Sequence, residues 1–414
     1  MTTQELNPFS QNQAETSLPT AAKLLYRVLD NLEFGSLAFT APDGRTKTFK
    51  GKHDGPHADI RFADWGVARE AIKSAEIGLA ECYRDHRLSS SNLSAFLQLC
   101  AVNAQALEKI FYGNPFIALF FRLKHFFRNN TRRGSKKNIA AHYDLSNDFY
   151  QLWLDETMTY SSALFDGNHA LTLEFAQAAK YERILQILNP QRGETILEIG
   201  CGWGGFAEHA VKTRGVNIHG ITLSTEQLAF ATSRIERLGF TKNATFELID
   251  YRDVTAQYDH IVSIEMFEAV GERYWPTYFQ AVHDRLKPNG RAVIQAITID
   301  EEAFPRYRAT SDFIREFIFP GGMLAPVSRF ISDAKEAGLS ADTPHMFGLD
   351  YAETLRRWLD RVNAQVDKMS KAKFDEKFLQ IWRFYLCYCE AGFRAKRTDV
   401  MQITLQRSDK GIRT

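Results

Sequence analysis

Strand and helix patterns alternate along the second half of the chain. Apolar runs at 195–199, 216–222, 245–249, 260–264 and 292–297 predict strands, and helical spacing of apolar residues at 205–212 and 224–238 predicts helices between them. Such alternation is typical of a parallel sheet with helices on both faces, the doubly wound α/β fold. We place this domain at residues 139–414, with a helical insertion near residues 301–330.

The first third of the chain has shorter elements. Residues 1–20 are polar, rich in Gln, Asn, Ser and Thr, and contain no apolar core of a secretion signal, so they predict a disordered leader. Short helical and strand patterns follow, with a turn at Asp43-Gly44, and predict a small α+β domain over residues 21–110. The longest apolar stretch, 116–121, is far below the about 18 residues that a membrane-spanning helix needs.

The segment 111–138 combines aromatic and basic side chains. Phe and Tyr residues are interspersed with Arg and Lys up to residue 130, and four more basic residues follow by residue 137. This composition is typical of an amphipathic segment at a membrane surface. The alternative is a helix packed between two domains, with its basic residues in a solvated linker.

The charge balance and the cysteines exclude several functional classes. Lys and Arg number 51 against 50 Asp and Glu, a net charge of +1, which argues against a strongly basic nucleic-acid binder. The five cysteines, Cys82, Cys100, Cys201, Cys387 and Cys389, are odd in number and lack the spacing of a zinc site. We therefore expect reduced thiols in a cytoplasmic protein, and no metal.

A glycine-rich turn follows the strand pattern at 195–199. Glycines between a strand and a helix let the backbone approach a nucleotide-like ligand closely. Gly200, Gly202 and Gly205 also satisfy a dinucleotide fingerprint, but the next strand ends at Thr222 instead of the acid that this fingerprint requires. Together with Glu198 inside the strand, the turn resembles the first motif of class I S-adenosylmethionine-dependent methyltransferases.

Further motifs resemble the cyclopropane-fatty-acyl-phospholipid synthase family, in the family's order, over about residues 138–400. They are His142–Tyr150, Met158–Phe165, Ile221–Gln227, Asp250–Asp253, Ser263–Gly271, Phe317–Gly322, His345–Tyr351 and Gly392–Arg394. The resemblance implies a class I methyltransferase (Rossmann-like) fold, preceded here by the small α+β domain, to which it assigns a lipid- or membrane-engaging role.

The implied reaction transfers a methyl group from S-adenosylmethionine to the cis double bond of an unsaturated acyl chain in a membrane phospholipid. The resulting carbocation closes to a cyclopropane ring when a bound bicarbonate ion removes a proton. The resemblance also implies a homodimer that works peripherally at the inner face of the membrane.

The resemblance assigns site residues by motif. The bicarbonate positions are Ser162, Glu268, Gln295, Tyr351 and the backbone of Ile297. The cofactor positions are Tyr160 and Ser161 at the methionine end; Gly200, Gly202 and Gly204 at the backbone approach; Thr222, Leu223 and Gln227 near the ribose; and Asp250, Tyr251 and Arg252 near the adenine.

Three positions depart from the family's usual residues. Ser162 replaces a cysteine and Gln295 a histidine; both keep a hydrogen-bond donor, so an anion could still bind. A changed set of anion-binding residues could also move the base relative to the carbocation. The product would then be a methylene or methyl-branched chain instead of a ring. Thr222 stands where class I enzymes place an acid, and Gln227 could share its role. An inactive lipid-binding homologue and a small-molecule methyltransferase are the more distant alternatives.

Overall fold

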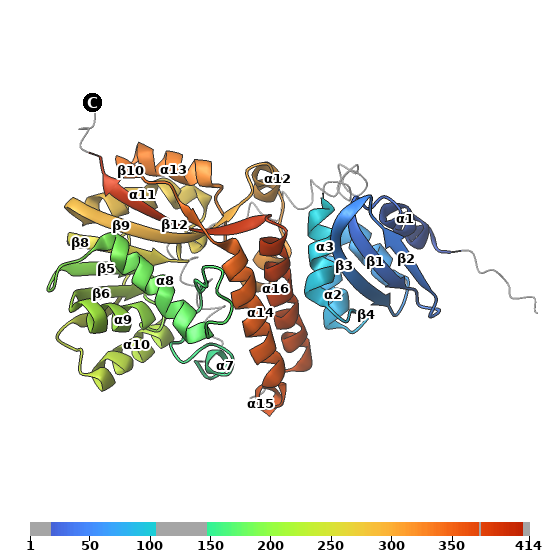
Figure 1. Ribbon diagram of the computed structural model, residues 1–414, viewed down its shortest axis with the longest axis horizontal. Coiled ribbons are helices and arrows are strands. Elements are labelled where there is room, and N and C mark those ends of the chain that lie inside the picture. Colours follow the sequence, from blue (N-terminus) through green and yellow to red (C-terminus); the bar gives the residue numbers. More distant parts are fainter. Residues whose placement is uncertain (1–17, 105–146, 372–373, 409–414) are drawn as a thin grey trace, which may run out of the picture.

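The computed structural model describes residues 18–104, 147–371 and 374–408 (Figure 1). The predicted leader lies outside this range except for residues 18–20, and the aromatic and basic segment 111–138 lies outside it entirely. None of the helices in the described ranges is long and apolar enough to cross a bilayer.

The N-terminal part forms a four-stranded mixed sheet covered by helices. The strand order is β2-β1-β3-β4, with β1 and β3 parallel and the other pairs antiparallel. Helix α2 is interrupted at Ala75, whose φ is 46°. The elements are α1 (Thr20–Leu29), β1 (Phe34–Thr40), β2 (Thr46–Lys50), β3 (His53–Phe62), α2 (Gly66–Arg84), β4 (Leu88–Ser89) and α3 (Leu93–Val102).

The remainder of the chain is built on an eight-stranded sheet. Its order is β10-β12-β9-β8-β5-β6-β7, with β11 paired to β12. The strands β5 to β9 are parallel, as predicted, whereas β12 runs antiparallel to β9. The strands are β5 (Thr195–Ile199), β6 (Asn217–Thr222), β7 (Ala244–Leu248), β8 (Tyr258–Ile264), β9 (Leu286–Ile299), β10 (Leu339–Ala341), β11 (His345–Met346) and β12 (Thr398–Arg407).

Helices cover both faces of this sheet, which confirms the doubly wound α/β class. Apolar side chains of α8, α9 and α10 pack on one face around Ile196 and Val262, and those of α11 and α13 pack on the other around Leu197 and Ile261. The elements outside the sheet are α7 (Asn147–Gln151), α8 (Leu173–Leu188), α9 (Gly205–Arg214), α10 (Thr225–Leu238), η1 (Phe267–Ala269), η2 (Glu272–Tyr274), α11 (Trp275–Arg285), α12 (Phe304–Ala309), η3 (Ile314–Ile318), α13 (Val327–Glu336), α14 (Gly348–Ala364), α15 (Val366–Lys371) and α16 (Glu376–Arg394).

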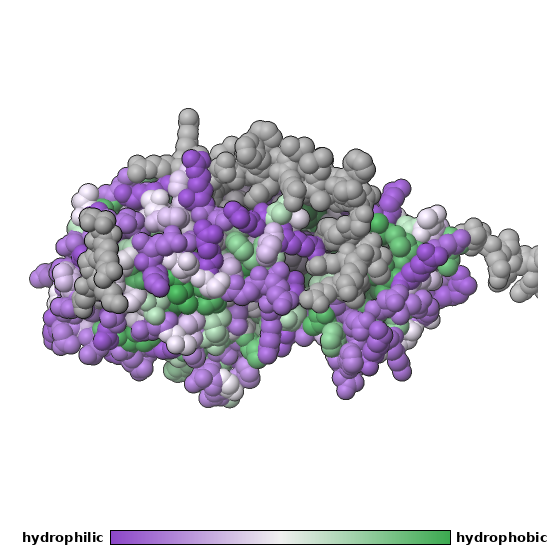
Figure 2. Space-filling model, turned by 90° about the horizontal axis from the view of Figure 1, so that it is seen from above, coloured by the Kyte–Doolittle hydropathy of each residue, from purple (hydrophilic) through white to green (hydrophobic). Residues whose placement is uncertain are grey.

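Two long C-terminal helices connect the two sheets. Helix α16 packs against α14 on one side and against α2 and α3 on the other, so it stands between the large sheet and the N-terminal part (Figure 1). One continuous apolar core therefore contains Phe39 and Phe62 of the small sheet together with Trp358 and Trp382 of these helices. Figure 2 shows that hydrophilic side chains predominate on one outer face, with apolar residues in scattered patches.

Candidate active site

Two cavities meet inside the molecule. The larger has a volume of about 540 Å³ and the smaller about 150 Å³. Three residues line both: Tyr160, Glu265 and Ala269. These three residues, which border both cavities, are called the junction below.

The smaller cavity lies at the carboxyl ends of the parallel strands, where doubly wound folds bind ligands. The turn after β5 lines it: Gly200 has a φ of 83° and Gly202 a φ of 52°. A β-carbon on Gly202 would have no atom within 4 Å, so the backbone there borders open space. The turn thus gives a ligand direct access to the backbone.

A hydroxyl–amide pair follows the next strand. Thr222 Oγ1 donates a hydrogen bond to Gln227 Oε1 at 3.0 Å and accepts one from the Ser224 backbone N–H at 3.1 Å. Ser224 also caps α10. Thr222, Leu223 and Gln227, all predicted at the ribose, line the smaller cavity, and so do Tyr160, Ser161 and Tyr251.

Three predicted cofactor residues do not line this cavity. Gly204 precedes the first turn of α9, and a β-carbon there would face Ala231 at 3.2 Å. Arg252 donates two side-chain hydrogen bonds to Asp250, at 2.7 and 2.5 Å. In this structure these residues shape the surroundings of the cavity without lining it.

We expect the Thr222→Val variant to bind S-adenosylmethionine about fivefold more weakly, because loss of this hydroxyl costs about 1 kcal/mol and frees Gln227 to rotate. Isothermal titration calorimetry measures the affinity. The exposed neighbour Thr225 serves as the matched control, since Thr225→Val leaves the Thr222–Gln227 pair intact. Equal affinities of the two variants would contradict the expectation.

Two charged residues in this region are not among the predicted site residues, although Glu198 belongs to the motif at the glycine turn. Glu198 lines the smaller cavity, and its Oε2 is buried without a hydrogen-bond partner among the described residues. Burial raises its pKa well above the ordinary value. Lys180 is fully buried and donates to Ser161 Oγ at 2.6 Å. Burial lowers its pKa to about 7, opposed by the carboxylates of Glu265 and Asp155.

A third such residue, Glu265, stands at the centre of the site. It follows β8 directly and has a φ of 50°, a left-handed conformation that is uncommon for a residue with a side chain. Its Oε1 accepts hydrogen bonds from the Ser162 N–H at 2.8 Å and from Gln295 Nε2 at 2.7 Å. Its Oε2 accepts one from the Tyr351 hydroxyl at 2.6 Å.

Glu268 lies three residues further on and lines only the larger cavity. The backbone N–H of Ile297 donates to Glu268 Oε1 at 2.5 Å, and Oε2 is buried with no partner among the described residues. Burial and the nearby Glu265 carboxylate raise its pKa to about 8. Glu268 is therefore mainly protonated at neutral pH.

The five residues predicted to bind bicarbonate come together, but around protein carboxyl groups. The Ser162 backbone N–H, Gln295 and Tyr351 donate to Glu265, and the Ile297 backbone N–H donates to Glu268. The Ser162 hydroxyl donates to the Ala163 carbonyl at 2.9 Å. The donors predicted for the anion are already used, so the residues present do not fit a bicarbonate ion at that position. Glu265 could have been found from the sequence, because it is a carboxylate directly after a central parallel strand, and ligand-binding sites of this fold lie at that end of the strands.

We expect the stability of the protein to fall as Glu268 ionises. A carboxyl whose pKa rises from 4.5 to about 8 on folding contributes stability that is full below pH 4.5 and is lost as pH rises through 8. Between about pH 6 and pH 9 the melting temperature of the wild type should therefore decrease more steeply than that of Glu268→Gln. Differential scanning calorimetry measures both, with the exposed Glu302→Gln as control. Parallel curves for wild type and Glu268→Gln would refute the assignment.

Comparison with known proteins identifies the family. The family described as mycolic acid cyclopropane synthetase matches residues 130–403. The chain belongs to this family. It is 37% identical over 404 residues to a tuberculostearic acid methyltransferase of Mycobacterium tuberculosis, covering 95% of this chain and 92% of the relative. It is 32% identical over 369 residues to the cyclopropane-fatty-acyl-phospholipid synthase of Escherichia coli K12, covering 86% and 90%.

Solved structures of family members agree with the fold. A mycolic acid cyclopropane synthase in complex with SAH and CTAB superposes with a TM-score of 0.62 at 32% identity, over 66% of this chain and 98% of that one. The cyclopropane synthase MmaA2 from Mycobacterium tuberculosis gives 0.61 at 31% identity, over 65% and 97%. The chain is thus an S-adenosylmethionine-dependent methyltransferase of the cyclopropane synthetase family.

The smaller cavity fits the cofactor of this family. Its open glycine turn accepts a close ligand, and the Thr222–Gln227 pair offers groups that can bind hydroxyls. The unpartnered Glu198 Oε2 is a buried acceptor that a ligand ammonium or hydroxyl group can satisfy. The residues present therefore suit S-adenosylmethionine.

Proposed function

We propose that the protein transfers a methyl group from S-adenosylmethionine to the cis double bond of an unsaturated acyl chain in a phospholipid, and that loss of a proton closes a cyclopropane ring. The observation that carries the proposal is the junction of the two cavities at Tyr160, Glu265 and Ala269. The smaller cavity suits the cofactor, and the larger suits a hydrocarbon chain.

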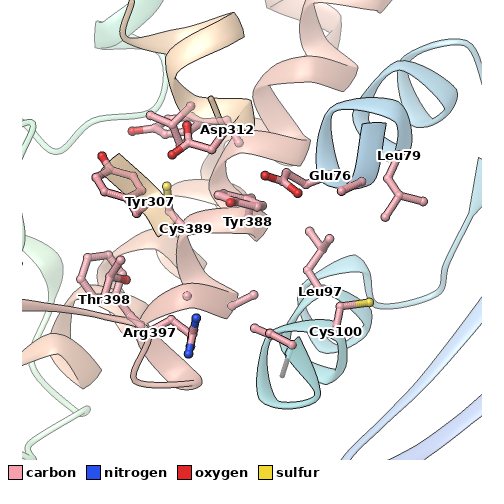
Figure 3. Close-up of a pocket in the computed structure, with 18 of the residues that line it drawn as sticks. Glu76, Leu79, Leu97, Cys100, Tyr307, Asp312, Tyr388, Cys389, Arg397 and Thr398 are labelled. Atoms are coloured by element: carbon pink, nitrogen blue, oxygen red, sulfur yellow. The ribbon is translucent and has the colours of Figure 1, made fainter. Parts of the chain in front are cut away.

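The larger cavity has predominantly apolar walls. It is lined from the N-terminal part by side chains such as Leu37, Phe39 and Phe96, and from the catalytic part by Phe319 and Leu355. Figure 3 shows it between α2 and α3, which carry Leu79 and Leu97, and α16, which carries Tyr388 and Cys389. Burial of apolar surface in such a cavity favours an acyl chain over a polar substrate.

The walls near the junction suit a reaction through a cation. An alkene is a weak nucleophile, and S-adenosylmethionine supplies an electrophilic methyl group bound to a sulfonium. Aromatic faces stabilise a cation and exclude the water that would capture it. Tyr351 stacks on Phe393 with ring centroids 4.5 Å apart, and Tyr160 lies 5.4 Å from Trp358. The hydroxyls of Tyr160 and Tyr385 are 2.8 Å apart, which fixes the ring of Tyr160 at the junction.

Basic side chains in the larger cavity support a phospholipid as the substrate. Arg306 and Arg397 line it, and Figure 3 shows the Arg397 side chain extending into this space. Arg397 makes no ion pair with any residue that the structure describes. A phosphate group would provide the missing charge partner. Since phospholipids reside in bilayers, the proposal includes peripheral binding at the inner face of the membrane, by a homodimer.

The product decides the proposal. Purified protein is incubated with S-adenosylmethionine and vesicles of cis-monounsaturated phosphatidylglycerol, and the acyl chains are analysed by mass spectrometry and proton NMR. We expect a mass increase of one carbon and two hydrogens, together with the high-field resonances of a cyclopropane. Unchanged acyl chains, with methylation of a small polar acceptor instead, would overturn the proposal.

A second candidate product is a methylene or methyl-branched chain. Two observations favour it. A relative whose alignment covers 95% of this chain is a tuberculostearic acid methyltransferase. Ser162 and Gln295 also differ from the residues that the family usually has at the predicted anion-binding positions. The same NMR spectrum distinguishes the products, because a methylene group gives olefinic resonances and a ring does not.

We expect the Arg397→Ala variant to raise the KM for phospholipid vesicles about tenfold while kcat changes little, because a charge-assisted hydrogen bond to phosphate contributes about 1.5 to 3 kcal/mol before solvent screening. Initial rates over a range of lipid concentrations give both constants. Lys368→Ala is the control, since Lys368 is exposed on α15 and lines neither cavity. A fall in kcat at unchanged KM would contradict a role in lipid binding.

A further inference from the structure

We infer that Glu265 is the proton acceptor of this enzyme, so that the reaction needs no bound bicarbonate ion. This inference rests on the proposed function and names the group that completes it. Among the described residues, Glu265 is the only carboxylate that lines both cavities. It therefore borders both the proposed cofactor cavity and the proposed acyl-chain cavity.

The backbone places this carboxylate at the junction under strain. Glu265 follows β8, which lies between β5 and β9 in the middle of the sheet, and its N–H donates to the Gln295 carbonyl at 2.8 Å. Its φ of 50° is rare for a residue with a β-carbon, and such conformations persist where the surroundings determine them. The strained turn directs the carboxylate toward Ser162, Gln295 and Tyr351 rather than along the strand.

Its partners orient the side chain through hydrogen bonds to both carboxylate oxygens. Three donors, a backbone N–H, an amide and a phenol, bind it at 2.6 to 2.8 Å. Burial raises the pKa of Glu265, and the buried Lys180 together with these three donors opposes that effect. A carboxylate has about four acceptor positions, so Oε2, which accepts only from Tyr351, keeps a lone pair for a proton.

Glu268, the second carboxyl group near the junction, differs from Glu265 in its surroundings. Its pKa of about 8 keeps it largely neutral, and the charge of Glu265 is among the causes. Two adjacent carboxyl groups in different environments commonly separate into an acid and a base. Here the group with three donors is the base, and the group with an unpartnered oxygen is the neutral one.

The step balances without a further reactant. After methyl transfer, the chain carries a carbocation next to the carbon that holds the new methyl group. A C–H bond of this methyl group breaks, its electron pair forms the second carbon–carbon bond of the ring, and the proton goes to Glu265 Oε2. Glu265 is then neutral and must release the proton to solvent before the next turnover.

The test compares the wild type with two substitutions at this position in buffer freed of carbon dioxide. We expect the wild type to keep its rate within about twofold when bicarbonate is removed, and Glu265→Gln to lose about 100-fold or more in kcat, the usual scale of general base catalysis. Glu265→Gly opens the position for an anion, tolerates the positive φ, and should regain activity when bicarbonate is added.

Controls separate chemistry from folding. Glu390→Gln removes a different buried carboxylate, which binds Ser94 and Arg394 and lines neither cavity, and should keep wild-type activity. Cofactor affinity by calorimetry and the melting temperature verify that Glu265→Gln is folded. A wild type that requires bicarbonate, or a Glu265→Gln variant with more than about a tenth of the wild-type kcat, overturns the inference. A wild type that methylates no phospholipid under any condition overturns the proposed function instead.

Discussion

Replacing Gly200 by valine is expected to abolish cofactor binding and methyl transfer. A β-carbon at this position would lie 2.8 Å from the Met266 side chain, and the φ of 83° is a conformation that β-branched residues avoid. The substitution therefore strains the turn and pushes it against the ligand. We expect the affinity for S-adenosylmethionine to fall about 100-fold or more, because the glycines of this turn let the backbone approach the ligand closely. Calorimetry measures the binding, and lipid mass spectrometry the activity.

The control for this variant is Gly239→Val. Gly239 has a similar φ of 73° at the end of α10, but a β-carbon there has no atom within 4 Å. The control should lose stability from backbone strain alone and keep its cofactor affinity. If both variants bind equally well, the turn after β5 does not contact the cofactor.

Leu97→Trp is expected to block long acyl chains while leaving the cofactor site intact. Leu97 lies on α3, lines the larger cavity and is far in sequence from every residue of the smaller one. A tryptophan adds bulk to a buried position and costs about 1 to 3 kcal/mol of stability. We expect methylation of chains of 16 to 18 carbons to fall about 30-fold or more, since their apolar surface no longer fits. Competition assays with a range of chain lengths measure the change.

Two measurements interpret that result. Affinity for S-adenosylmethionine should stay within about twofold of the wild type, because the two cavities meet only at the junction. Leu97→Ala enlarges the cavity at the same position and should keep activity on long chains. Unaltered activity of Leu97→Trp would mean that the acyl chain does not reach the N-terminal part.

The sequence predicted the sheet well because both of its faces are buried. Strands covered on both sides are continuously apolar, so their positions stand out from the sequence. The antiparallel β12 was not predicted, because the buried polar residues Gln402 and Thr404 interrupt its apolar run and its direction depends on distant pairing with β9. The predicted insertion at 301–330 contains short helices, α12 and the π-helical η3, with α13 extending beyond it.

The candidate site was predictable where a motif fixes the backbone. The glycine turn and the Thr222–Gln227 pair lie at the smaller cavity, because they are local to two strand ends. Glu265 was missed because its partners Ser162, Gln295 and Tyr351 are distant in sequence. The larger cavity could not be predicted from any local sequence pattern, because the residues that line it come from elements between α1 and α16.

The apolar core that joins the small sheet to helices α14 and α16 has a consequence for folding. Cutting the polypeptide between its two sheets would expose tryptophan and phenylalanine surfaces on both fragments, which favours aggregation over separate native states. We therefore expect the intact polypeptide to unfold in a single cooperative thermal transition. Exchange of the N-terminal part between relatives should succeed only where its surface matches that of α16.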